Sequence, residues 1–212
     1  MSDYSRQYLI DLIAETNNCS WNRHINYNVY YRILIGKDLI GLDLSNLDLN
    51  KINLSESNLT DAIFKGANLN GAILTGAILI GVDLSEMDLS GLGLNSVNLV
   101  RANLTNVNLA YSKLNNASLN NANLIGANLV GVDFRGANLT EANLKDANLT
   151  NSNLTKTNLN RANLSSVDFR GANLTDATLI RADLTKANLT GVQLNKTDLR
   201  GANLVGAVGL KL

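Results

Sequence analysis

The feature that most constrains this chain is a five-residue period that runs through most of its length. From Leu39 to Leu204, every fifth residue is leucine or phenylalanine, at 34 positions, with no insertion. The residue two places earlier is alanine in 17 cases and valine in six, and the residue between them is asparagine or aspartate in 26. We call these three residues the centre, the companion and the outward position. An α-helix repeats every 3.6 residues and a strand every two, so neither alone explains the period.

A short extended stretch followed by a corner does fit a period of five. Side chains alternate along such a stretch, so the companion and the centre point inward and the Asn or Asp points outward. The other two residues turn the chain, and 13 of the 16 glycines lie two residues after a centre, where a turn requires an unusual backbone. Four corners close a square, so about 20 residues form one coil, with coils about 4.8 Å apart. We therefore expect an all-β solenoid, a quadrilateral β-helix.

The repeat unit reads Ala-(Asp/Asn)-Leu-X-X, as in Ala67-Asn68-Leu69-Asn70-Gly71. Over residues 37–206 it resembles the pentapeptide-repeat family, which implies a right-handed four-sided β-helix. The resemblance implies less about activity. Members of the family include quinolone-resistance and mycobacterial proteins that look like DNA and bind gyrase, cyanobacterial regulators of cell differentiation, and many proteins without a known role.

The non-repeating segment 1–36 is predicted to be an N-terminal cap, followed by the β-helix over 37–212. Apolar residues on one helical face predict a short amphipathic helix at about residues 4–15 of this cap. We expect the cap to cover the apolar end of the solenoid, and the alternative is a recognition module. The stretch 204–212 shows no helical cap. An open edge of this kind invites end-to-end pairing, so a homodimer through the C-terminal end is expected.

The sequence offers little that resembles a catalytic or metal site. His24 is the only histidine and Cys19 the only cysteine, so neither a two-histidine nor a multi-cysteine site can form within one chain. We interpret both as packing residues. The Asn and Asp rows recur at one structural position, where such side chains bond to local backbone. The sequence therefore predicts neither an enzyme nor a cofactor.

Charge and targeting signals narrow the choice of partner. The 18 basic and 18 acidic residues balance, but residues 37–100 hold three lysines against eight acids, which include Asp61, Asp83 and Glu86. Residues 101–212 hold 12 basic and seven acidic side chains. Such a weak dipole does not predict a nucleic-acid partner. Without an apolar run near 20 residues or a signal-peptide pattern, we expect a cytoplasmic protein with no membrane contact.

Breaks in the outward rule supply candidate binding residues. Isoleucine replaces Asn or Asp at Ile63, Ile73 and Ile78, while Ile80 and Val100 follow centres and lie 20 residues apart, hence one above the other. Together these five form a candidate apolar patch on neighbouring faces of the early coils. The alternative is tolerated variation on a robust β surface.

Arginines supply a secondary candidate site. Arg101, Arg161 and Arg181 fall in one column of the square, and Arg200 lies in the neighbouring coil. Glu141 interrupts that column, which favours a solvated face over an anion site.

These observations favour a non-catalytic, regulatory protein-interaction scaffold whose protein partner the sequence does not identify. The alternative is a DNA-mimicking inhibitor of DNA gyrase. Mimicry requires a strongly anionic rod, whereas this chain has zero formal net charge. Ice binding requires a flat threonine array, and the threonines here fall on different faces.

Overall fold

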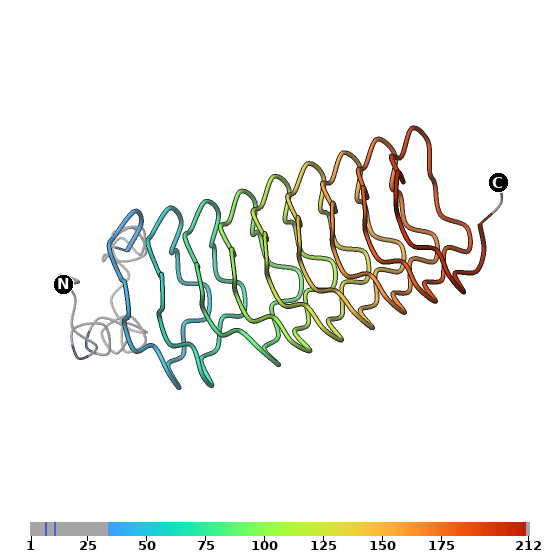
Figure 1. Cartoon of the computed structure of the whole chain (residues 1–212). Helices are drawn as coiled ribbons and strands as arrows, with labels where there is room; N and C mark the ends of the chain where they lie inside the picture. The colour runs from blue at the N-terminus through green and yellow to red at the C-terminus, as the bar shows by residue number, and fades with distance from the viewer. Residues whose placement is uncertain (1–6, 8–10, 12–33, 211–212) are drawn as a thin grey trace.

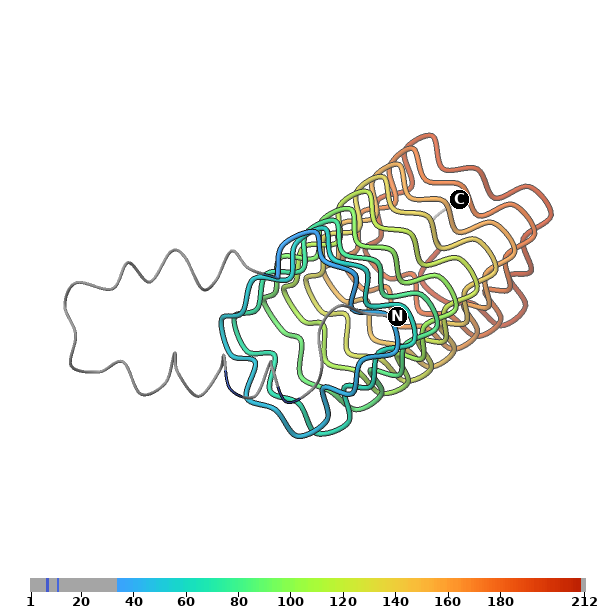
Figure 2. The same cartoon turned by 90° about the vertical axis from the view of Figure 1, so that its left-hand side faces the viewer.

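The computed structural model describes Gln7, Asp11 and residues 34–210, and the latter wind into a rod of stacked coils (Figure 1). Viewed towards the end of the rod, the coils form nested outlines (Figure 2). The regular β structure consists of single-residue parallel bridges, from Asp38↔Asn58 to Asn188↔Val208. Each bridge joins residues 20 apart, and bridge residues recur every five residues. Four sides of five residues therefore make one coil, and the predicted right-handed quadrilateral β-helix is confirmed.

The corners share one backbone conformation. Every fifth residue from Gly36 to Gly206 has a positive φ, between 55° and 72°. At every described corner except that between Leu79 and Val82, the N–H of the next companion donates to the carbonyl of the preceding centre, as from Ala137 to Phe134 at 2.9 Å. A positive φ at the third residue of such a four-residue turn is typical of a type II turn, which explains the glycines. Non-glycine residues, such as Arg101 and Lys186, also adopt this conformation.

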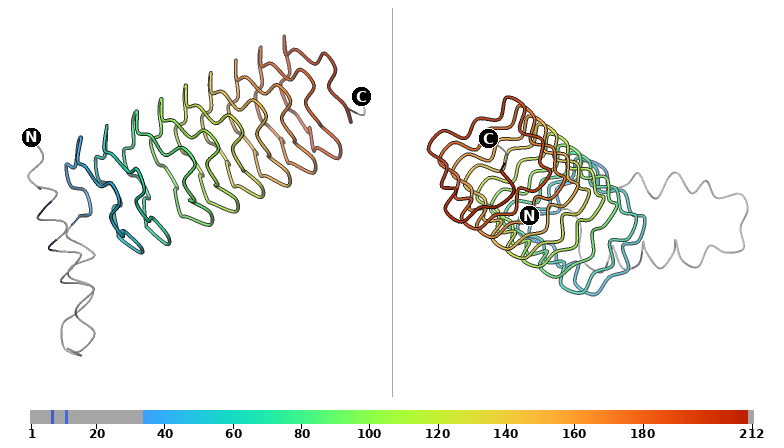
Figure 3. Two further views of the ribbon diagram at one scale, coloured as in Figure 1. Left: turned by 90° about the horizontal axis from the view of Figure 1, so that it is seen from below. Right: turned by 90° about the vertical axis from the view of Figure 1, so that its right-hand side faces the viewer.

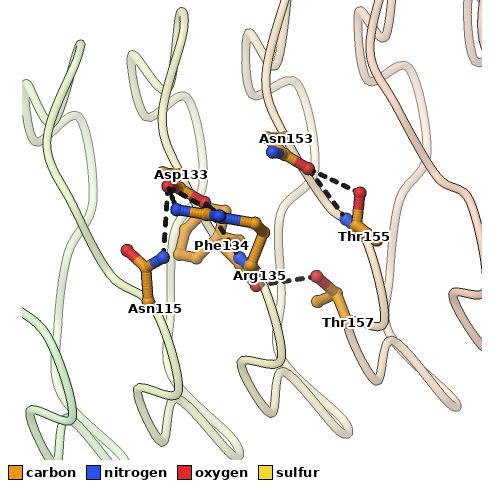
Figure 4. Close-up of polar contacts among 7 residues, drawn as sticks. All are labelled: Asn115, Asp133, Phe134, Arg135, Asn153, Thr155 and Thr157. Carbon is orange, nitrogen blue, oxygen red and sulfur yellow. Dashed lines mark hydrogen bonds and ion pairs between the residues drawn. The ribbon is translucent and has the colours of Figure 1, made fainter.

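The core is a column of centres and companions inside the square. The centre residues are almost completely buried along most of the rod, and the register already includes Leu34, which is 3% exposed. Hydroxyl side chains replace alanine at four buried companions, which are Ser57, Ser112, Ser152 and Thr157. Their hydroxyl groups donate to backbone carbonyls, as from Thr157 Oγ1 to Phe134 O at 2.8 Å (Figure 4). These polar groups are thus paired within the core, as burial requires.

Backbone pairing explains why the outward position favours Asn and Asp. In the unit 132–136 the five N–H groups donate in order to Leu129 O (3.2 Å), Ser112 O (3.0 Å), Asn153 O (2.8 Å), Asp133 Oδ1 (3.2 Å) and Thr155 O (3.0 Å). Backbone carbonyls thus accept four of the five, and only the residue after the centre depends on a side chain. The outward Asn or Asp supplies that acceptor, which keeps the backbone satisfied at the corner.

Two variants of this corner are visible in Figure 4. Asn153 Oδ1 accepts both the N–H and the hydroxyl of Thr155, at 3.1 and 2.7 Å. In the second variant, Asp133 also forms an ion pair with Arg135, two residues on, with Nη2–Oδ2 at 2.7 Å. The same Asp-x-Arg pair recurs at Asp168 and Arg170. The Asp and Arg side chains at these corners therefore form local bonds that stabilise the repeat.

The predicted cap lies largely outside the described residues. Within its expected helix, the structure describes Gln7 and Asp11, which are helical, with Gln7 Nε2 donating to Asp11 Oδ1 at 2.8 Å. Cys19 and His24 fall outside the described residues.

Candidate functional site

The ladder between coils is interrupted at one place within the stack. No backbone hydrogen bond of ordinary length joins residues 62–75 to residues 81–94, although the intervals before and after this place in the described chain are bonded on every side. Ile63↔Asp83 and Ile73↔Gly93 remain bridge partners, but Asn68 and Asp88 are unpaired with each other. The gap between successive coils is visibly wider here (Figures 1 and 3). We call this opening the seam.

A cleft of about 920 Å³ occupies the seam, within the size range of ligand clefts. Its apolar wall includes Ile63, which is half exposed, and the partly buried side chain of Met87. Its charged residues are Asp61, Lys65, Asp83, Glu86 and Asp88. Four carboxylates against one ammonium make the cleft acidic.

Two of these carboxylates are held in the charged form. Hydrogen bonds from the hydroxyl and the amide of Ser85 lower the pKa of Asp83 below its ordinary value. The corresponding bonds from Ser90 lower the pKa of Asp88. The amide groups of Asn103 and Asn108 in the next coil add a bond to each, at 2.9 Å. Both side chains therefore carry a negative charge throughout the neutral range.

Companion residues change size across the seam. In the coil before it, all four companions are alanine, at positions 62, 67, 72 and 77. In the coil after it they are Val82, Met87, Leu92 and Val97. Bulkier side chains in a narrow, packed interior displace the backbone. Met87 remains only partly buried, and Ala67, which lies below it in the same column, is also partly exposed. The coil on the other side of the alanines also has bulky companions, Leu42, Leu47 and Ile52, and its ladder to the alanine coil is intact, so the change of companion size does not by itself explain the seam.

The five predicted apolar residues do not form one patch. Ile63 and Ile73 are exposed, at 50% and 44%, whereas Ile78, Ile80 and Val100 are only half-buried surface residues. Ile63 and Ile73 lie ten residues apart, half of a 20-residue coil, and therefore on opposite sides of the square. The expectation of one patch on neighbouring faces is wrong for this pair. Only Ile63 lines the cleft.

The arginines are likewise dispersed. Arg161 pairs with Glu141, with Nη1–Oε1 at 3.1 Å, and Arg200 pairs with Asp198 at 2.7 Å. Arg101 and Arg181 are exposed and form no ion pair with any described residue. The side chains of this column are thus exposed, and Glu141 pairs with Arg161 within it.

Only some of the residues that line the seam could be named from the sequence. Asp61, Asp83 and Glu86 were among the acids noted in residues 37–100, but Met87 was not singled out. Its signal is that a methionine stands where the repeat places a small residue. Within the described part of the chain, no three His, Cys, Asp or Glu side chains gather to hold a metal ion. No helix among those residues has the length and apolar character needed to cross a membrane.

Comparisons with known proteins agree with the fold. The family model for pentapeptide repeats matches residues 38–76, 74–106 and 102–140, and the model described as pentapeptide repeat region matches 127–204. A comparison with curated proteins finds no match.

Solved structures of similar proteins include two from cyanobacteria. HetL from Nostoc, a pentapeptide repeat protein involved in heterocyst differentiation regulation, is 28% identical over 99% of this chain and 100% of HetL, with a TM-score of 0.45. Rfr23 from Cyanothece is 30% identical over 62% of this chain and 86% of its own, with a TM-score of 0.38. QnrB1, a plasmid-mediated fluoroquinolone resistance protein, is 21% identical over 80% and 88% of the two chains, with a TM-score of 0.29. With the repeat models covering residues 38–204, this chain belongs to the pentapeptide-repeat family.

Proposed function

We propose that this protein is a non-catalytic, regulatory scaffold that binds a protein partner at the seam. The observation that carries the proposal is the cleft itself. It is a concave, acidic and partly apolar site on a rod whose other sides repeat one regular surface. A protein that acts by binding changes the activity, location or assembly of its partner, and we therefore place it among regulatory proteins.

Exposed apolar atoms at the cleft would provide the binding energy. Ile63 exposes half of its side-chain surface, and Met87 adds a flexible side chain that adapts to irregular partners. Burial of such groups yields about 25 cal/mol for each Å² of apolar surface. The surrounding carboxylates would select a partner with a basic rim and speed its approach.

The gyrase alternative has less support. A DNA mimic needs acidic side chains along the rod, whereas the acids here concentrate in residues 37–100 and the later coils are net basic. The acidic side chains at the seam are confined to a short part of the rod. They suit a short basic segment of a protein better than the extended DNA-binding surface of gyrase.

Two substitutions at equivalent positions test the proposal. Ile63→Asn changes the cleft, and Ile73→Asn changes the same position of the repeat on the opposite side of the same coil. Both introduce the residue that the repeat favours, so both variants should fold. In quantitative pull-downs from the native organism, we expect wild type and Ile73→Asn to capture equal amounts of one partner protein. Ile63→Asn should capture at least five-fold less of it. Equal capture by all three would refute the seam as the binding site.

A further inference from the structure

We propose that the occupant of the seam is a short, basic, extended peptide segment of the partner, which pairs with the backbone groups that the ladder leaves open. The inference rests on the proposed function and specifies the partner's chemistry. An edge with unpaired N–H and C=O groups is a template for an added strand. Here the seam presents two such edges, one on each coil.

The open groups can be named by comparison with the intact ladder. Two coils further on, the N–H of Leu109 donates to Asn128 O at 2.8 Å, and the N–H of Asn128 donates to Val107 O at 2.9 Å. The corresponding N–H groups of Leu69 and Asp88 have no backbone or side-chain acceptor among the described residues. Unpaired backbone groups are costly unless water or a ligand satisfies them. An extended peptide supplies donors and acceptors in the required alternation.

The length of the seam limits the bound segment. Bridges at Ile63↔Asp83 and Ile73↔Gly93 close its two ends. Between them the chain forms one side of the square, residues 67–69 in one coil and 87–89 in the other. One side accommodates an extended stretch of only a few residues. The occupant is therefore a short segment rather than a folded surface.

The side chains beside these groups define the sequence of the segment. Side chains of a strand alternate between its two faces. In a peptide aligned with the coils, one face would lie beside the outward position of Asp88, with Asp83 and Glu86 nearby. The other face would lie beside the partly buried companions Ala67 and Met87. The structure thus favours alternating basic and apolar residues, with Lys or Arg facing the carboxylates.

A labelled hexapeptide of alternating lysine and valine, capped at both ends, tests the inference by fluorescence anisotropy at low salt. We expect saturable binding with a dissociation constant in the micromolar to sub-millimolar range. The same peptide N-methylated at alternate residues keeps its charges but loses backbone donors, and it should bind at least tenfold more weakly. Equal binding of both peptides would show attraction by charge alone and would overturn strand pairing, as would no binding of the parent peptide.

Paired protein variants locate the peptide. Asp83→Asn with Asp88→Asn removes two charges at the seam while preserving an Oδ1 acceptor, and should weaken binding about fivefold. Asp38→Asn with Asp48→Asn removes two charges at the same repeat position elsewhere in the acidic half, and should change affinity less than twofold. Equal losses from the two double variants would contradict a site at the seam. If the peptide fails to bind while Ile63→Asn alone still loses the partner, strand pairing is wrong and the proposed function stands.

Discussion

The outward Asn or Asp is expected to stabilise each corner through one hydrogen-bond acceptor, and Asn153→Ala tests this directly. In the structure, Asn153 Oδ1 accepts the Thr155 N–H at 3.1 Å and the Thr155 hydroxyl at 2.7 Å. Alanine removes the acceptor and leaves a partly buried N–H without a partner. A lost hydrogen bond of this kind costs about 1–2 kcal/mol in free energy of unfolding. For a protein of this size, that corresponds to a melting temperature lower by about 2–8 °C.

Asn153→Asp is the matched control, because the carboxylate keeps the acceptor in place. Aspartate occupies the outward position at Asp133 and Asp168 with the same N–H bond to the residue two places on, at 3.2 and 3.1 Å. At neutral pH we expect Asn153→Asp to melt within about 1 °C of wild type. Calorimetry and denaturant unfolding should agree on this order. Equal melting temperatures for Asn153→Ala and Asn153→Asp would refute the assigned role of the outward side chain.

Three further expectations follow from the same structure. Leu124→Lys places a charge at a fully buried centre and should unfold the rod, whereas Asn121→Lys at an exposed corner should leave circular dichroism and melting nearly unchanged. Bonds from Arg170 lower the pKa of Asp168, so the stability advantage of wild type over Asp168→Asn should be complete above about pH 5. It should disappear as the pH falls through that lowered pKa, and an advantage that grows as the pH falls would contradict the sign. In a supercoiling assay, sub-micromolar protein should leave gyrase activity unchanged, and clear inhibition would revive the DNA-mimic alternative.

The architecture was predictable because one period determines almost every contact. The spacing of centres assigns inside and outside, and the 20-residue coil follows from four corners. Glycines two residues after the centres indicated the corners. The structure shows a positive φ at these positions, both at a glycine such as Gly71 and at a non-glycine residue such as Lys186. The local role expected of the Asn and Asp rows is confirmed by bonds such as that from the Thr155 amide to Asn153.

The candidate site was less predictable, for two different reasons. The prediction of a single patch was wrong for Ile63 and Ile73 because of their spacing. Ten residues separate them, which places them on opposite sides of a 20-residue coil. That conclusion was available from the period alone. The seam has no such signal in the sequence, because Leu42, Leu47 and Ile52 stack on the same coil of alanines without interrupting the ladder. Residue types show bulky companions on both sides of the alanine coil, and only three-dimensional packing decides which of the two intervals opens.

Amide hydrogen exchange measured residue by residue tests the open seam most directly. The N–H groups of Leu69 and Asp88 should exchange faster than those of Leu109 and Asn128, which occupy the same positions two coils further on and are hydrogen-bonded. A difference of at least a hundredfold is expected, because one pair has no hydrogen-bond acceptor among the described residues and the other is released only when coils separate. Equal protection of the two pairs would show that the ladder is continuous and would remove the cleft on which the proposed binding site depends.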